Sequence, residues 1–189
     1  MTTPCLFLDR DGVINADAGY VYRREAFVFL PGIFDFVRAV HALSWPVVVV
    51  TNQSGIGRGL YSEADFEVLT GWMLARFAAE AAPITRVYHC PFHPDAGIER
   101  YRQDHPWRKP APGMIFAAQR DLDLDLAASA LVGNEARDIA AGSAAGVGLL
   151  VLLTADIPPP PGLAPGCHVT RNLPATRDLV LAFARAKRP

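Results

Sequence analysis

Two aspartates near the amino terminus have the spacing of a catalytic pair. Asp9 and Asp11 follow an apolar run at residues 5–8 and precede Gly12. The run predicts a buried parallel strand, which places both acids at its carboxyl end, where open α/β sheets hold their chemistry. Residues two apart in extended chain share a face, and glycine permits a sharp turn beyond them. Alone, Asp-x-Asp-Gly is better explained as a solvated turn, so the rest of the chain decides.

Three further groups of polar residues follow predicted strands or the long loop. They are Thr51 with Asn52, Arg108 with Lys109, and Asn134 with Glu135 and Asp138. A carboxylate can accept a phosphoryl group covalently, and Mg²⁺ prefers oxygen ligands together with water and a phosphate oxygen. Lysine and hydroxyl donors stabilise the charge on the transferred group. The combined set therefore indicates phosphoryl transfer.

Alternating strands and helices must position these residues. Strands are predicted at residues 5–8, 47–51, 86–90, 130–133 and 148–153, with an edge strand at 168–170 and a short extended piece at 27–29. Helices are predicted at 33–43, 62–77, 113–120, 139–145 and 174–187, with a glycine-rich loop at 52–59 and a helix end plus turn at 121–125. This alternation predicts an α/β fold, a three-layer doubly wound parallel sheet, in one domain spanning residues 1–189.

Composition excludes several classes of protein. The 189 residues are 51% apolar and carry 18 basic against 19 acidic side chains, so charge makes no case for nucleic-acid binding. No apolar run approaches the roughly 20 residues of a membrane span, and no signal peptide is recognisable. Three cysteines do not make a disulfide framework. We expect a monomeric cytoplasmic protein that binds a small molecule and neither nucleic acid nor membrane.

Four motifs occur in the order of a known superfamily. They span residues 7–15 (FLDRDGVIN), 51–59 (TNQSGIGRG), 108–114 (RKPAPGM) and 132–138 (VGNEARD). Together they resemble the haloacid dehalogenase (HAD) superfamily and, within it, the heptose bisphosphate and histidinol-phosphate phosphatases. The resemblance implies a Mg²⁺-dependent phosphomonoester hydrolase acting on a sugar (bis)phosphate through an aspartyl-phosphate. Removal of the 7-phosphate of D-glycero-D-manno-heptose 1,7-bisphosphate is the expected reaction, with histidinol phosphate as the alternative substrate.

The same resemblance implies a role for individual residues. Asp9 would be the nucleophile, and Asp11 the general acid and then the base. Thr51 would bind a phosphoryl oxygen, and Lys109 would neutralise the nucleophile and the phosphate. The substrate-binding residues would be Arg10, Asp17, Ala18, Gly19, Tyr20, Asn52, Gln53, Ser54 and Arg108. Asp9, the backbone carbonyl of Asp11, and Asn134 would hold Mg²⁺.

Motif spacing leaves no room for a cap domain. About 40 residues separate Asp11 from Thr51, and a loop and a helix fill them. The interval from Thr51 to Lys109 must also hold a helix and a strand. We therefore expect an open, cap-less site that the substrate itself helps to cover.

The fourth motif departs from the family pattern. Asn134 stands where the family carries aspartate, and Glu135 where a basic or small residue is usual. An amide oxygen is a ligand without charge, so Mg²⁺ binding should weaken. Glu135 or Asp138 could substitute as the ligand, and loss of activity is the third alternative.

The second departure lies in the long loop at residues 91–107. Related heptose phosphatases carry a C-x-H…C-x-C zinc site there, and the corresponding positions here are Cys90, Phe92, His105 and Trp107. One cysteine and one histidine are too few for a closed tetrahedral site, so we expect no zinc.

The sequence raises two other classes of protein. The glycines at 55, 57 and 59 hint at a dinucleotide loop, but Leu60 occupies the position where G-x-G-x-x-G needs its last glycine. A nicotinamide oxidoreductase is therefore disfavoured. A catalytically impaired sugar-phosphate-binding protein on the same fold stays open, and phosphate release would distinguish it from an enzyme.

Overall fold

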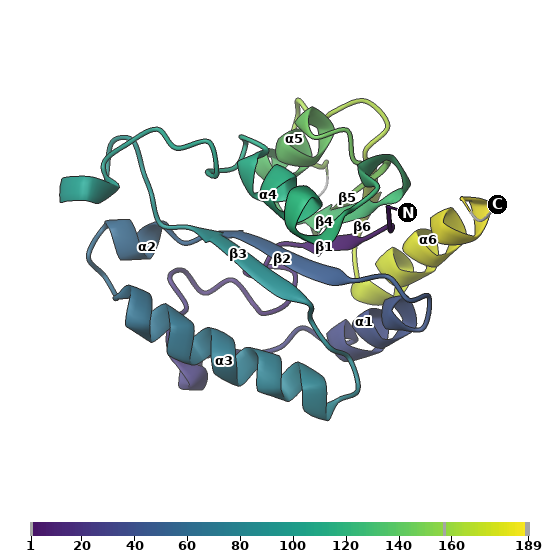
Figure 1. Cartoon of the computed structure of the whole chain (residues 1–189), viewed down its shortest axis with the longest axis horizontal. Helices are drawn as coiled ribbons and strands as arrows, with labels where there is room; N and C mark the ends of the chain where they lie inside the picture. Colours follow the sequence, from purple (N-terminus) through teal and green to yellow (C-terminus); the bar gives the residue numbers. More distant parts are fainter. Residues whose placement is uncertain (1, 157, 188–189) are drawn as a thin grey trace.

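Six parallel strands form one sheet in the order β3-β2-β1-β4-β5-β6 (Figure 1). The strands are β1 (Leu6–Leu8), β2 (Val47–Asn52), β3 (Arg86–Cys90), β4 (Ala130–Gly133), β5 (Leu149–Leu153) and β6 (His168–Thr170). The structure, a computed structural model, describes residues 2–156 and 158–187. All pairings are parallel, so every carboxyl end lies at the same edge of the sheet.

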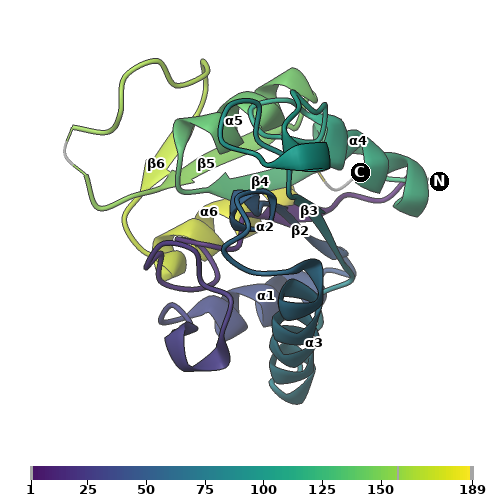
Figure 2. The ribbon, with the colours of Figure 1, turned by 90° about the vertical axis from the view of Figure 1, so that its left-hand side faces the viewer.

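Helices cover both faces of this sheet. They are α1 (Ile33–His41), α2 (Ser54–Gly57), α3 (Glu63–Ala79), α4 (Gly113–Leu122), α5 (Ala136–Ala144) and α6 (Leu173–Ala186), with 3₁₀ turns η1 (Arg24–Ala26), η2 (Glu99–Tyr101) and η3 (Leu126–Ala128). Figure 2 shows α1 and α3 on one side of the sheet and α4 and α5 on the other. The predicted three-layer doubly wound arrangement is confirmed.

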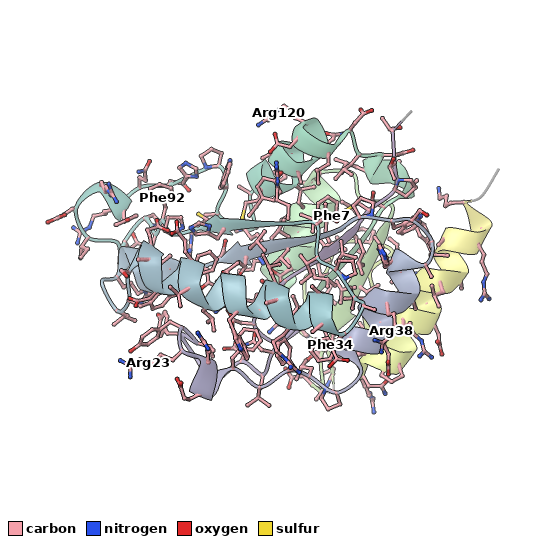
Figure 3. All side chains as sticks on the ribbon, turned by 60° about the horizontal axis from the view of Figure 1, so that its bottom comes forward. Phe7, Arg23, Phe34, Arg38, Phe92 and Arg120 are labelled. Atoms are coloured by element: carbon pink, nitrogen blue, oxygen red, sulfur yellow. The ribbon has the colours of Figure 1, made fainter. Side chains whose placement is uncertain are left out.

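The molecule has one hydrophobic core on each face of the sheet, because side chains along each strand alternate between the two faces. Leu6 and Leu8 pack with apolar residues of α1, α3 and α6, whereas Phe7 packs with those of α4 and α5. Successive side chains of a strand point to opposite faces, so a strand buried on both faces is apolar throughout. Figure 3 shows Phe7 inside the molecule, with Arg38 and Arg120 at its outer surface. No described helix has the length and apolarity needed to cross a membrane.

Strand order reverses beside β1, and this places the site. The chain runs from β1 outward through β2 to β3, then returns to pair β4 with the other edge of β1, so that Leu6 is opposite both Val47 and Ala130. Open α/β sheets bind ligands outside the carboxyl ends at such a switch point. The residues directly after β1 and β4 are Asp9 and Asn134.

Local signals predicted most elements, with two corrections. The loop prediction for residues 52–59 is wrong in part, since Ser54–Gly57 form the short helix α2. Helix α5 begins at Ala136, three residues before the predicted start, because the Asp138 carboxylate accepts hydrogen bonds from the backbone N–H groups of Asn134 and Glu135. The capping box predicted from Ser62 and Asp65 is present at the start of α3.

The segment after β1 is an irregular loop with the single turn η1, and the segment after β3 is a loop containing η2. Neither is a domain, so the described residues contain no cap over the sheet edge, as the motif spacing predicted. The piece predicted as extended at residues 27–29 contributes one isolated bridge, between Phe29 and Asn15.

Candidate active site

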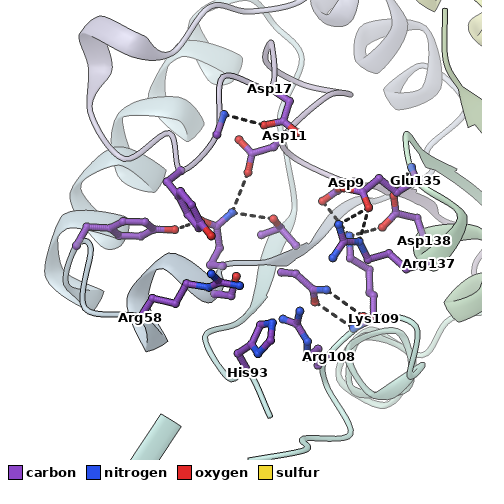
Figure 4. A pocket seen from close by; sticks show the side chains of 17 residues that line it. Asp9, Asp11, Asp17, Arg58, His93, Arg108, Lys109, Glu135, Arg137 and Asp138 are labelled. Atoms are coloured by element: carbon purple, nitrogen blue, oxygen red, sulfur yellow. Dashed lines mark hydrogen bonds and ion pairs between the residues drawn. The ribbon is translucent and has the colours of Figure 1, made fainter. Parts of the chain in front are cut away.

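A polar cavity of about 340 Å³ opens at the carboxyl edge of the sheet (Figure 4). Its walls come from the loops after β1, β2 and β4 and from the loop that enters α4. The lining residues are Asp9, Asp11, Asp17, Gly19, Tyr20, Thr51, Asn52, Gln53, Ser54, Arg58, Tyr61, His93, Arg108, Lys109, Glu135, Arg137 and Asp138. The cavity therefore brings together residues from all four sequence motifs.

Lys109 lies between two carboxylates at the base of the cavity. Its Nζ is 2.9 Å from Oδ1 of Asp9 and 2.7 Å from Oδ1 of Asp138, and it also donates a hydrogen bond to the carbonyl of Val50 at 2.8 Å. The lysine and Asp138 side chains are each only 3% exposed. We call Asp9, Thr51, Lys109 and Asp138 the floor of the site.

Two carboxylates share one ammonium on this floor. Burial raises the pKa of Asp9 to about 7, and the carboxylate of Asp138 adds to the rise, although Lys109 opposes both effects. The two carboxylates raise the pKa of Lys109, against the effect of its burial, so the lysine stays charged. A cation bound beside Asp9 would oppose the rise in its pKa and favour the ionised carboxylate.

The Asp11 carboxylate is surrounded by hydrogen-bond donors. Arg10 approaches it through Nε and Nη2, with the Nη2–Oδ2 distance at 2.9 Å. Asn15 donates to Oδ1 at 2.9 Å and Gln53 to Oδ2 at 3.1 Å. Donors to both oxygens hold this side chain at the edge of the cavity, in a defined orientation.

Asn52 fixes the backbone that carries Lys109. Its side-chain oxygen accepts the Lys109 N–H at 3.0 Å and its amide donates to the Lys109 carbonyl at 3.0 Å. This pair of bonds joins the end of β2 to the chain entering α4, 57 residues later. Arg108 is tied to the same region through a 3.1 Å bond from Nη1 to the carbonyl of Phe92.

The oxygen atoms present fit a small divalent cation. Oδ1 of Asn134 is buried without a hydrogen-bond partner. The Asn134 side chain lies against Gly12, whose φ of +80° suits glycine and where a Cβ would stand 2.1 Å from Nδ2. The Asn134 oxygen, the Asp9 carboxylate and the Asp11 carbonyl are the ligands Mg²⁺ prefers. Only one of these is a charged side chain, and the described residues contain no cluster of three acidic, histidine or cysteine ligands.

The two substitutes considered for Asn134 have other partners. Both oxygens of Asp138 are engaged, Oδ1 by Lys109 and Oδ2 by the backbone N–H groups at the start of α5. Glu135 is paired with the guanidinium of Arg137. Asn134 is the candidate whose side-chain oxygen is both buried and without a hydrogen-bond partner.

Most residues predicted to bind substrate line the cavity, but three members of the predicted site do not. Arg10 is 1% exposed and lies beneath Asp11, where Nη2 donates to the carbonyl of Val21 at 2.7 Å. Ala18 and Asn134 are also outside the lining set. Arg10 therefore contacts the Asp11 carboxylate from the side away from the cavity.

Four lining residues were not predicted. They are Arg58, Tyr61, His93 and Arg137. Arg58 lies within the second motif and Arg137 within the fourth. A basic residue inside a motif was therefore a sequence signal that could have placed both at the cavity. Tyr61 and His93 lie outside the motifs, and nothing in their sequence context marks them. Figure 4 shows Arg58, His93 and Arg108 across the cavity from Asp11 and Asp17. We call Arg58, His93, Arg108 and Arg137 the rim.

Aromatic packing fills the loop at residues 91–107, where the family resemblance raised the question of zinc. The Phe92 and His105 rings stack at 4.2 Å, and His105 Nδ1 accepts the backbone N–H of Trp107 at 3.1 Å. Burial raises the pKa of the Cys90 thiol, which opposes formation of a thiolate ligand. The absence of zinc stays a prediction.

Comparison with known proteins gives related sequences over the whole chain. The HAD-hydrolase-like family model matches residues 106–159. The D-glycero-alpha-D-manno-heptose-1,7-bisphosphate 7-phosphatase of Burkholderia mallei is 59% identical over 81% of this chain and 81% of its own. The D-glycero-beta-D-manno-heptose-1,7-bisphosphate 7-phosphatase of Escherichia coli K12 is 44% identical over 100% of this chain and 97% of its own.

Solved structures agree with these sequence relatives. A D,D-heptose 1,7-bisphosphate phosphatase from B. bronchiseptica, complexed with magnesium and phosphate, superposes with a TM-score of 0.83 at 29% identity, covering 95% of this chain and 99% of that one. A HAD-like phosphatase from Mesorhizobium loti superposes with a TM-score of 0.86 at 34% identity, covering 100% and 89%.

Proposed function

The chain belongs to the HAD-like family of D-glycero-D-manno-heptose-1,7-bisphosphate 7-phosphatases, and we propose that it removes the 7-phosphate from this heptose bisphosphate. One observation carries the chemistry: the Asp9 carboxylate at the end of β1 is 2.9 Å from the ammonium of Lys109 inside the polar cavity. A buried carboxylate paired with a cation can attack phosphorus while the cation balances the charge that arrives with the phosphate.

The reaction proceeds in two steps. An oxygen of Asp9 forms a bond to phosphorus, and the bond between phosphorus and the sugar oxygen breaks, while Asp11, which enters this step in its protonated form, gives its proton to the departing alkoxide. Asp11, now ionised, then takes a proton from water as the water oxygen attacks the aspartyl-phosphate. The Asp9–phosphorus bond breaks, and phosphate leaves with the carboxylate restored.

The floor stabilises the charge that moves in these steps. Lys109 is held by Asp138 and by the carbonyl of Val50, so its ammonium needs little rearrangement as the phosphoryl group passes. Thr51, one residue before the end of β2, lines the same cavity, with its hydroxyl accepting a 2.9 Å hydrogen bond from Gln53 and its own proton available for a phosphoryl oxygen.

Asp9, the Asp11 carbonyl and Asn134 would hold Mg²⁺. When bound, this ion would supply positive charge to the phosphoryl oxygens and to the floor. Support for the assignment comes from the partnerless buried oxygen of Asn134 and from the two carboxylates that share the single ammonium of Lys109.

The rim supplies the basis for recognising a bisphosphate. Arg58, Arg108 and Arg137 place three guanidinium groups around the opening, suited to the phosphate that is not cleaved. Residues 17–20 and 51–54 form the adjacent wall, where the sugar would lie. With no cap among the described residues, part of the substrate would stay exposed to water.

Phosphate release from a panel of phosphomonoesters tests the proposal. The panel contains both anomers of the heptose bisphosphate, since relatives are named for each, together with histidinol phosphate and common sugar monophosphates. With Mg²⁺ present, kcat/KM for one heptose anomer should exceed that for the other phosphates by roughly a hundredfold. A larger value for histidinol phosphate would contradict the assignment, and no release from any ester would indicate a binding protein.

A further inference from the structure

We propose that Tyr61 is a positioning residue for the phosphatase reaction, because its hydroxyl holds the Gln53 amide in the orientation that supports Asp11 and Thr51. The inference rests on the proposed function, since it concerns the general acid of that reaction. Neither Tyr61 nor a link from it to the acid is apparent from the sequence motifs.

A continuous chain of hydrogen bonds connects the tyrosine to the acid. The Tyr61 hydroxyl donates to Oε1 of Gln53 at 2.6 Å. The Gln53 Nε2 group donates to Oδ2 of Asp11 at 3.1 Å and to Oγ1 of Thr51 at 2.9 Å. Tyr61 and Gln53 are 7% and 2% exposed, so water competes little for these bonds.

The hydrogen bonds define one orientation of the Gln53 amide. Burial raises the pKa of Tyr61 to about 12, so its hydroxyl keeps the proton that it donates to Oε1 at neutral pH. Both hydrogens of the amide then point at the acid and the threonine. If the amide turned over, Oδ2 of Asp11 and Oγ1 of Thr51 would both lose the hydrogen bond that they accept from Nε2. The tyrosine hydroxyl thus selects the orientation in which Gln53 supports two catalytic groups.

Packing holds the Tyr61 ring where its hydroxyl reaches Gln53. The ring stacks on Tyr22 with centroids 5.1 Å apart and planes 5° from parallel. It also lies directly against α2, because a Cβ on Gly55 would stand 2.1 Å from Cε1 of Tyr61. The Tyr61–Gln53 bond therefore closes the segment around α2, and any larger residue at position 55 would push the ring away.

The consequence for catalysis concerns the leaving group. A sugar alkoxide is a poor leaving group that needs the Asp11 proton, whereas the nitrophenolate of 4-nitrophenyl phosphate departs without one. An Asp11 side chain that is less well held should therefore slow phosphoryl transfer from an alkyl phosphate to Asp9 and spare transfer from the aryl ester, whereas the later attack of water is common to both substrates. The comparison is therefore made on kcat/KM, which reports the first of these two steps.

Tyr61→Phe tests the proposal, with Tyr22→Phe as the matched control. The control removes a hydroxyl from the stacked neighbour and leaves the hydrogen-bonded chain intact. For Tyr61→Phe we expect kcat on the heptose bisphosphate to fall about tenfold, a fraction of what a general acid contributes, with KM nearly unchanged. The kcat/KM for 4-nitrophenyl phosphate, which reports transfer to Asp9, should change less than about twofold. In a Gln53→Ala background, Tyr61→Phe should have no further effect on kcat.

Other outcomes would overturn the positioning role. These are equal losses of kcat/KM on alkyl and aryl esters, a Tyr61→Phe variant as active as Tyr22→Phe, or additive losses with Gln53→Ala. Thermal unfolding of each variant identifies any general damage to the fold. Failure of the wild type to hydrolyse the heptose bisphosphate contradicts the proposed function instead, and the same comparison is then made with whichever alkyl phosphate of the panel it cleaves.

Discussion

The floor and the rim of the cavity are built in opposite ways. On the floor, Lys109 and Asp138 are almost completely buried, and Lys109 has three polar partners within 2.9 Å. On the rim, Arg137 is 41% exposed and its ion-pair partner Glu135 is 43% exposed. The geometry of the floor is therefore fixed by several contacts to its buried charged groups, whereas the rim is held by a few contacts at the exposed surface.

From this difference in burial we expect the floor to carry out the chemistry and the rim to recognise the substrate. Buried charges can hold a fixed geometry because little water competes for their hydrogen bonds, and removing one leaves its partners without compensation. Exposed guanidinium groups keep much of their hydration and contribute little to stability. We therefore expect floor substitutions to affect turnover and folding, and rim substitutions to affect substrate binding.

The largest effect should follow Asp9→Asn on the floor. An amide cannot form the aspartyl-phosphate, so turnover should fall by roughly a thousandfold or more, while the fold is retained. Phosphate release from the heptose bisphosphate measures this loss, and circular dichroism confirms folding. Substantial activity in the purified variant would remove Asp9 from its role as nucleophile.

Lys109→Met should damage both turnover and stability. Removing the shared ammonium leaves two buried carboxylates facing each other, which should cost about 3–5 kcal/mol in the free energy of unfolding. Urea denaturation measures the change. The double variant Lys109→Met with Asp138→Asn should be more stable than Lys109→Met alone, since one carboxylate is then neutral. Equal stability of the two variants would contradict this account of the floor.

Arg137→Gln should act on binding alone. Loss of a charged donor at the rim should raise KM for the heptose bisphosphate about fivefold with kcat nearly unchanged. The control is Arg137→Lys, which keeps the charge and should raise KM less. A substrate lacking the 1-phosphate should show no such increase. If its KM rises equally, Arg137 does not contact the retained phosphate.

Asn134→Asp should strengthen Mg²⁺ binding next to the floor. A carboxylate in place of the neutral amide restores one charge beside Asp9, so the Mg²⁺ concentration for half-maximal activity should fall about threefold to tenfold. Titration of activity with Mg²⁺ measures this, and Glu135→Ala should leave the titration nearly unaltered. An unchanged Mg²⁺ dependence in Asn134→Asp, with activity destroyed in Glu135→Ala, would instead make Glu135 the ligand.

The smallest effect concerns zinc. Because Phe92 and Trp107 occupy two ligand positions, elemental analysis should find no stoichiometric zinc, and a zinc chelator should leave the melting temperature unaltered. Bound zinc together with unfolding on chelation would contradict the expectation.

Local patterns were enough to predict the sheet and which residues lie at its carboxyl edge. The strand boundaries follow from continuous apolar and β-branched runs, which only a sheet buried on both faces explains. Asp9 and Thr51 could be placed at one edge because parallel strands bring their carboxyl ends together, and Lys109 lines the same cavity from the loop that enters α4. The short helix α2 was missed because glycine residues predict turns. The contact of α2 with the Tyr61 ring lies outside its own four residues, so the sequence of that segment does not reveal it.

Only the tertiary structure decided which side chain contacts which. The sequence by itself determined the fold class, the order of the motifs and the presence of a carboxylate, a lysine and a hydroxyl at one sheet edge. It did not determine that Arg10 turns beneath Asp11, that Asp138 shares Lys109 with Asp9, or that Tyr61 reaches Gln53 across α2. These contacts depend on side-chain directions and burial set by segments distant in sequence. A motif specifies which groups are present, whereas packing from several elements determines where each group points.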